Sequence, residues 1–88
     1  MDTTQSAREY YEQGRTLRQK KLYDQALEAL RHAAHHPNYA GQSQIQVGLC
    51  LRAMGRHDEA VTALWEAANS SSLSQDEYTH VLYLLGQY

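Results

Sequence analysis

The sequence is poor in several residue types, and each shortage excludes a class of protein. It has no phenylalanine, one proline and one cysteine among 88 residues. Cys50 cannot form an intramolecular disulfide, which excludes a disulfide-stapled secreted domain and favours a reducing compartment, so a cytoplasmic location is expected. No apolar run approaches the ~20 residues that a membrane-spanning helix needs. The polar N-terminal segment has no apolar stretch, so no secretory signal is expected.

An excess of charge of one sign is also lacking. The formal net charge is −2 at pH 7, and 20% of the residues are charged. This balance gives no argument for a nucleic-acid partner or an anionic membrane surface. A chain of 88 residues forms one small domain, close to the lower limit for a self-supporting core.

What the sequence does contain is an internal repeat. Residues 23–34 read "YDQALEALRHAA" and residues 57–68 read "HDEAVTALWEAA". Aligning residues 7–40 with residues 41–74, a shift of 34 positions, matches nine identical residues without a gap. The identical pairs are Gly14 and Gly48, Leu17 and Leu51, Arg18 and Arg52, Asp24 and Asp58, Ala26 and Ala60, Ala29 and Ala63, Leu30 and Leu64, Ala33 and Ala67, and Ala34 and Ala68. Most of them are small or apolar, which indicates a repeated packing unit.

Each copy contains two helical patterns and no strand pattern. In "DQALEALRHAA" and "DEAVTALWEAA" the apolar residues recur with the i, i+3, i+4, i+7 spacing of a helix. The preceding segments, 6–20 and 40–54, are expected to be helical as well. Gly14 and Gly48 then lie where the second helix of each pair, through Ala26 and Ala60, approaches closely.

Several residues are expected to mark the helix ends. Asp24 and Asp58 precede the repeated stripes, where a carboxylate can cap the free amides. Ser6 and Ser74 each precede a glutamate by three residues, the spacing of a capping box. Gly55 suits the left-handed position that follows a helix.

This pattern resembles the tetratricopeptide repeat, a 34-residue helix–turn–helix unit with a W-x2-L-G-x2-Y…A-x3-F…P signature. The resemblance rests on "YEQGRTL" and "ALEAL" in the first copy and on "QIQVGLCL" and "AVTAL" in the second. It implies an all-α fold, a right-handed α-solenoid of about five helices. The first repeat would span 7–40 and the second 41–74. Residues 75–88 would form either a capping helix or the first helix of a truncated third repeat.

The resemblance also implies a function. The first helices of such pairs line a concave groove that receives a peptide segment of a partner protein. The matching positions are Arg8, Tyr11, Arg15, Arg18, Gln42, Ile45, Leu49, Arg52 and Tyr83, with His80 and Gln87 beside the last. Arginines beside an aromatic ring favour an acidic peptide, because the guanidinium donates two parallel hydrogen bonds to a carboxylate. The alternative is that Arg8, Arg15 and Arg18 are simply a solvated helix face.

The last segment suggests a second kind of function. "EYTHVLYLLGQY" places apolar side chains on more than one face, and a stack of repeats normally ends with a polar-faced cap. We therefore expect a homo-oligomer that forms through the C-terminal helix. The residues expected to carry this contact are Tyr78, Leu82, Leu85 and Tyr88. Under this alternative the chain is a self-assembly element of a larger repeat protein.

Catalytic, metal and cofactor sites are not expected. "HAAHH" brings His32, His35 and His36 together, but no carboxylate or cysteine completes a metal set there. Cys50 falls in a helical pattern, where a lone cysteine behaves as a small apolar residue. The sequence has no glycine-rich phosphate loop, nucleophile elbow or zinc-protease helix. A non-enzymatic protein without cofactors is therefore the expectation.

Overall fold

The computed structural model describes residues 3–70 and 73–86. These residues form five helices and no strand, which confirms the all-α prediction. The helices are α1 (Thr3–Gln19), α2 (Tyr23–Ala34), α3 (Ala40–Ala53), α4 (His57–Ala68) and α5 (Gln75–Leu85). None of the described helices combines the length and the apolar character that spanning a lipid bilayer would require.

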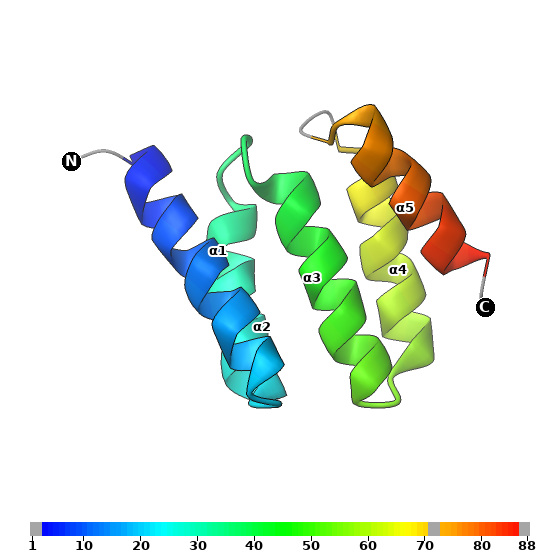
Figure 1. Ribbon diagram of the computed structural model, residues 1–88, viewed down its shortest axis with the longest axis horizontal. Coiled ribbons are helices and arrows are strands. Elements are labelled where there is room, and N and C mark those ends of the chain that lie inside the picture. The colour runs from blue at the N-terminus through cyan, green and yellow to red at the C-terminus, as the bar shows by residue number, and fades with distance from the viewer. Residues whose placement is uncertain (1–2, 71–72, 87–88) are drawn as a thin grey trace.

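The helices are arranged as two antiparallel hairpins followed by a single helix (Figure 1). α1 packs on α2 and α3 packs on α4. The contact of α2 with α3 joins the two hairpins, and the contact of α4 with α5 attaches the single helix to the second hairpin. The result is an elongated slab with extents of 40 × 28 × 17 Å. In Figure 1 α1 lies at one end of the slab and α5 at the other. The right-handed sense of this stack stays a prediction.

Close contact within each hairpin depends on a glycine. A Cβ atom built on Gly14 would lie 2.5 Å from Leu30 Cγ, and one built on Gly48 would lie 2.9 Å from Leu64 Cγ. The carbonyl oxygens of Ala26 and Ala60 would each be 3.4 Å away. The structure therefore confirms the close approach, with the leucine side chain as the nearer neighbour in both hairpins.

Two apolar clusters hold the hairpins together. The first joins α2, α3 and α4 through residues that include Leu30, Val47 and Cys50. The second joins α3, α4 and α5, and it is formed by Ile45, Leu64, Ala67, Val81 and Leu84. Because each cluster draws on helices from successive units, a hairpin alone could not bury its apolar stripe.

The helix ends agree with the sequence only in part. At α5 the predicted capping box is confirmed: the Glu77 amide donates to Ser74 Oγ at 3.2 Å, and the Ser74 amide donates to Glu77 Oε1 at 3.0 Å. The box predicted at Ser6 is wrong, because α1 already begins at Thr3. The helix caps predicted at Asp24 and Asp58 are wrong too. Both aspartates lie inside the first helical turn, where a negative charge still favours the positive end of the helix dipole.

The turns between the paired helices share one geometry. Gly55 follows α3 with φ of +81°, and Lys21 follows α1 with φ of +64°. In each turn the residue after it donates its amide five residues back, Leu22 to Leu17 at 2.9 Å and Arg56 to Leu51 at 2.8 Å. This is the hydrogen bond of a Schellman end, whose left-handed position favours glycine. The first hairpin therefore carries a lysine where the second has the preferred residue.

Exchanging the residue at this position should change stability in opposite directions in the two hairpins. Gly55→Ala should lower the free energy of unfolding by about 1 kcal/mol, because a Cβ disfavours the left-handed conformation. No described atom outside the immediate chain neighbours lies within 4 Å of that Cβ position, so the effect is conformational and not steric. Lys21→Gly should raise the free energy of unfolding by roughly 0.5 kcal/mol, since relief of strain exceeds the added freedom of the unfolded chain. Urea denaturation measures both values, and equal signs for the two variants would contradict the assignment.

Candidate peptide-binding face

Side chains from α1 and α3 meet at one polar site, which we call the Tyr11 cluster: Tyr11, Arg15, Arg18, Tyr39 and Gln46. Arg18 Nε donates to Gln46 Oε1 at 2.8 Å, which links the two helices. The ring of Tyr11 lies 5.7 Å from that of Tyr39, and the guanidinium carbon of Arg15 lies 5.8 Å from the centre of the Tyr11 ring. The cluster thus combines two aromatic rings with two guanidinium groups.

The phenol of Tyr11 stays protonated near neutral pH. Burial raises its pKa above the ordinary value, and the positive charges of Arg15 and Arg18 only partly offset this effect. The carboxylate of Glu77 also raises the pKa, whereas a hydrogen bond with Gln46 lowers it. The neutral hydroxyl can therefore act as a hydrogen-bond donor beside two fixed positive charges.

The chemistry of the Tyr11 cluster suits a carboxylate ligand. Arg15 is exposed, and a guanidinium presents parallel N–H donors that match the two oxygens of a carboxylate. The sequence predicted Tyr11, Arg15 and Arg18 for this face, and the structure brings these three together. The sequence did not predict Tyr39, which directly precedes α3, as part of this face. Its aromatic character just before a helix was the only signal available.

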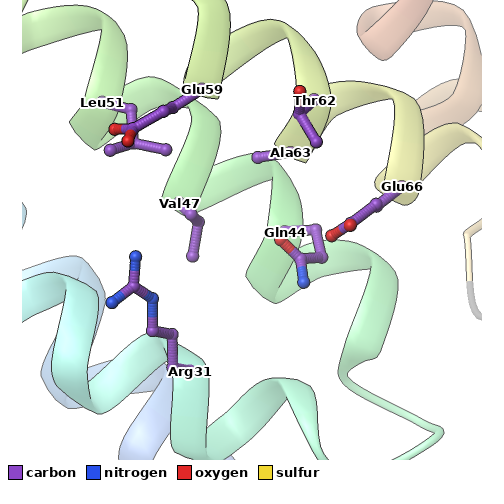
Figure 2. Close-up of a pocket in the computed structure, with 8 residues that line it drawn as sticks. All are labelled: Arg31, Gln44, Val47, Leu51, Glu59, Thr62, Ala63 and Glu66. Atoms are coloured by element: carbon purple, nitrogen blue, oxygen red, sulfur yellow. The ribbon is translucent and has the colours of Figure 1, made fainter. Parts of the chain in front are cut away.

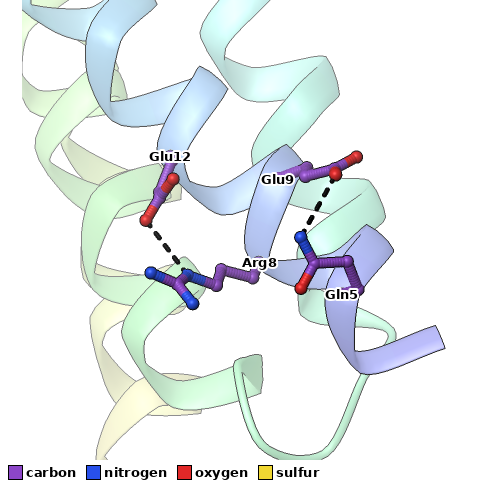
Figure 3. Close-up of polar contacts among 4 residues, drawn as sticks. All are labelled: Gln5, Arg8, Glu9 and Glu12. Atoms are coloured by element: carbon purple, nitrogen blue, oxygen red, sulfur yellow. Dashed lines mark hydrogen bonds and ion pairs between the residues drawn. The ribbon is translucent and has the colours of Figure 1, made fainter. Parts of the chain in front are cut away.

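Arg8, the fourth predicted residue of α1, has a local partner instead. Its Nε lies 3.3 Å from Glu12 Oε1, one helical turn later, and Gln5 Nε2 donates to Glu9 Oε1 at 3.4 Å (Figure 3). Both members of the Arg8–Glu12 pair are 60% exposed, so the pair contributes little to stability. The neighbouring carboxylate nonetheless offsets the charge of Arg8 toward an acidic ligand.

The predicted residues of α3 separate into different environments. Ile45 is only 5% exposed and belongs to the second apolar cluster, so its assignment to the binding face is wrong: the docking of α5 buries it. Leu49 is half-buried and packs against the same cluster. Gln42 is half-buried, and Arg52 is exposed in the last turn of the helix.

On α5 the predicted residues divide in the same way. Tyr83, predicted for the peptide face, is 66% exposed. Of the residues predicted for self-association, Tyr78 is 42% exposed and Leu82 is 45% exposed, whereas Leu85 is half-buried against the second cluster. Tyr88 lies outside the described residues, as does Gln87. His80 is exposed.

A shallow groove of about 300 Å³ lies on the other side of the slab, between α2, α3 and α4. Arg31 stands on one wall and Glu59 and Glu66 on the opposite wall, over a floor that includes Val47, Leu51 and Ala63 (Figure 2). This volume is at the low end for small-molecule sites. The groove walls carry carboxylates and one guanidinium group, but they hold no nucleophile paired with a general base.

Two of the histidines and the cysteine are held by packing or hydrogen bonds. His32 stacks on Tyr10 with ring centres 4.9 Å apart, and the Asn38 amide donates to His36 Nδ1 at 3.1 Å. Within the described residues no group of three His, Cys, Asp or Glu side chains is placed to hold a metal ion. Burial raises the pKa of the Cys50 thiol to about 11, an effect that Arg18 partly offsets. Cys50 is therefore a poor nucleophile at neutral pH.

Comparison of the chain with protein-family models, with curated proteins and with solved structures gives no match. The repeat and the Tyr11 cluster are the features of the chain that point to a function.

Proposed function

We propose that the chain is a protein-interaction module of the tetratricopeptide-repeat type. The support is the in-register repeat of 34 residues, together with two helical hairpins that use the same glycine–leucine contact. In this proposal α1, α3 and α5 line a concave groove, and the groove binds an extended acidic segment of a partner protein. The module has no catalytic activity and no cofactor, and it works in the cytoplasm, where its lone thiol stays reduced.

The Tyr11 cluster carries this proposal. It places Arg15 and Arg18 beside two tyrosine rings at the junction between the hairpins, where a peptide that crosses from α1 to α3 would pass. Tyrosine and arginine are enriched among the residues that dominate binding energy at protein interfaces. The bond from Arg18 to Gln46 holds that guanidinium in place before a ligand arrives, which reduces the entropy lost on binding.

The distribution of charge supports an acidic partner segment. The second helices of the hairpins, α2 and α4, carry five exposed carboxylates: Asp24, Glu28, Asp58, Glu59 and Glu66. On this side an acidic peptide would meet repulsion. α1 and α3 together contain four arginines and two glutamates, so their net charge is positive and attracts an acidic peptide.

Reversing two charges on the binding face should abolish capture of acidic peptides. The probe is a set of peptides selected from a random twelve-residue library on the full parent chain, and Asp and Glu should be enriched in it. Arg15→Glu together with Arg52→Glu should weaken binding of these peptides by roughly a hundredfold, because two attractive contacts become repulsive. Circular dichroism should stay unchanged, and the melting temperature should fall by no more than about 3 °C, since contacts of exposed charged side chains contribute little to stability.

A matched control removes the same charge from the other side. Arg31→Glu with Arg56→Glu reverses two exposed arginines, one in α2 and one directly before α4, and it should leave peptide affinity within about twofold. Selected peptides without acidic residues, or equal loss in both double variants, would contradict the proposed face. Affinity for the parent should fall as salt increases, because exposed charges are screened beyond about 8–10 Å at physiological ionic strength.

The alternative function is self-assembly through α5, which the exposure of Tyr78 and Leu82 favours. Light scattering over a dilution series separates the two functions. A self-assembly element dissociates on dilution without any added peptide, whereas a peptide-binding module keeps one mass throughout.

A further inference from the structure

The glycine position that allows close contact within each hairpin recurs at the end of α5. Gly86 follows Leu82 by four residues, as Gly14 follows Tyr10 and Gly48 follows Gln44. Around the Cβ position of Gly86, the described atoms within 4 Å are the carbonyl oxygens of Tyr83 at 3.4 Å and Leu82 at 3.5 Å. Both belong to its own helix. Among the described residues no leucine covers Gly86 as Leu30 covers Gly14.

α5 packs on the second hairpin as α3 packs on the first. When α5 is aligned with α3 so that Gly86 matches Gly48, 38 residues earlier, Val81 matches Ser43 and Leu84 matches Gln46. Ser43 and Val81 are both fully buried. Gln46 of α3 accepts a hydrogen bond from Arg18 of α1. In the corresponding way, Leu84 of α5 packs in one cluster with Ile45 of α3. α5 therefore uses the α3 face that contacts the preceding unit.

The opposite face of α5 is then the counterpart of the α3 face that α4 covers. In α3 that face contains Gly48, which is buried beneath Leu64. In α5 it contains Leu82 and Gly86, with Tyr78 one turn before Leu82. Leu82 is 45% exposed and Tyr78 is 42% exposed, so an apolar strip lies open beside a glycine.

We propose that the face formed by Tyr78, Leu82 and Gly86 binds an amphipathic helix of a partner protein. The helix carries the stripe Ala-x3-Leu-x2-Ala. The molecule itself defines this motif, because the two helices that cover Gly14 and Gly48 both present it. They do so as Ala26, Leu30 and Ala33 in α2 and as Ala60, Leu64 and Ala67 in α4. All six of these side chains are at most 1% exposed.

The occupant is a separate helix and not a second copy of the folded chain. In a second copy the α2 and α4 stripes are already buried, so neither is available without unfolding a hairpin. The segment 75–88 contains no alanine. Two α5 helices therefore cannot approach one another as α2 approaches α1, since each would place a larger side chain over the partner's glycine. This site is independent of the Tyr11 cluster and of the peptide proposed to bind there.

The test uses the full chain with isotopic labels and a synthetic peptide with the sequence of residues 56–70, acetylated and amidated. We expect saturable amide shifts confined to residues near Tyr78, Leu82 and Gly86. The affinity should be in the range of about 10–500 μM, because an isolated helix of this length is marginal and must order on binding. A peptide with leucine in place of Ala60 should bind roughly tenfold more weakly or worse, because the larger side chain blocks the close approach.

Two variants of the chain test whether the peptide binds at the proposed face of α5. Leu82→Glu should weaken peptide binding by roughly tenfold or more, because a charge would have to be buried in the contact. Gln25→Glu introduces the same residue at an exposed position of α2, outside both proposed binding sites, and it should bind the peptide like the parent. Equal effects of the two variants would overturn the proposal.

Other outcomes overturn it as well. Shifts centred on Gly48 and Leu64 would mean that the peptide replaces α4 by exchange. A parent chain that dimerises without peptide, and becomes monomeric on Leu82→Glu, would mean that a second copy covers this face. Absence of binding up to millimolar peptide would mean that this face of α5 needs no covering helix, and that α5 is a sufficient cap for the stack.

Discussion

Replacing Gly48 by leucine should lower the free energy of unfolding by about 3 kcal/mol or more, near the upper end for an overpacked core site. A Cβ alone would lie 2.9 Å from both Cγ and Cδ2 of Leu64, and the rest of the leucine side chain would have to fit between α3 and α4. Leu64 is only 1% exposed, so it has no space into which to move. The two helices must separate, and the second apolar cluster then loses contacts as well.

The control for this variant is Ala53→Leu in the same helix. Ala53 is exposed, so an added leucine there changes helix propensity and surface without a buried clash. Urea denaturation of both variants measures the difference directly. If Gly48→Leu and Ala53→Leu unfold at the same urea concentration, the contact between Gly48 and Leu64 does not exist. Gly48→Ala should lie between them, because the better helix propensity of alanine offsets part of the clash.

Val81→Asp is expected to release α5 from the second hairpin. Val81 is fully buried in the cluster with Ile45 and Leu64, and an isolated carboxylate in such a site costs several kcal/mol. Undocking α5 is the cheaper outcome, but it exposes Ile45 to water. We therefore expect a loss of about 3 kcal/mol or more in the free energy of unfolding, together with fast amide exchange throughout α5.

Tyr83→Asp is the matched control, because it places the same charge on the same helix at a side chain that is 66% exposed. It should change the free energy of unfolding by no more than about 0.5 kcal/mol. Slow amide exchange in α5 of the Val81→Asp variant would contradict the assigned packing. So would a common melting temperature for the two variants.

Much of the fold followed from the sequence because the relevant signals are local and repeated. The apolar spacing of 57–68 is a property of one helix, and its near copy at 23–34 shows that the same contact is made twice. The capping box at Ser74 and the left-handed Gly55 likewise depend on a few neighbouring residues. Gly14 and Gly48 could be assigned to a close approach because few other roles favour glycine inside a helix.

Other features required the packing of distant segments. Ile45 matches Tyr11 in the repeat, yet one is buried and the other is half-exposed, because α5 covers Ile45 while Gln46 and Tyr39 border Tyr11. The bond between Arg18 and Gln46 spans 28 residues, so no local pattern contains it.

The sequence by itself determined the five helices, the paired arrangement and the glycine positions. The reason is that apolar periodicity is a property of one helix, and small residues mark the contact between two helices that are neighbours in the chain. The tertiary structure decided which side chains are exposed, what surrounds Tyr11 and which face of α5 is open. Such properties depend on which helix comes next in space, and two nearly identical repeats can differ in them when their neighbours differ.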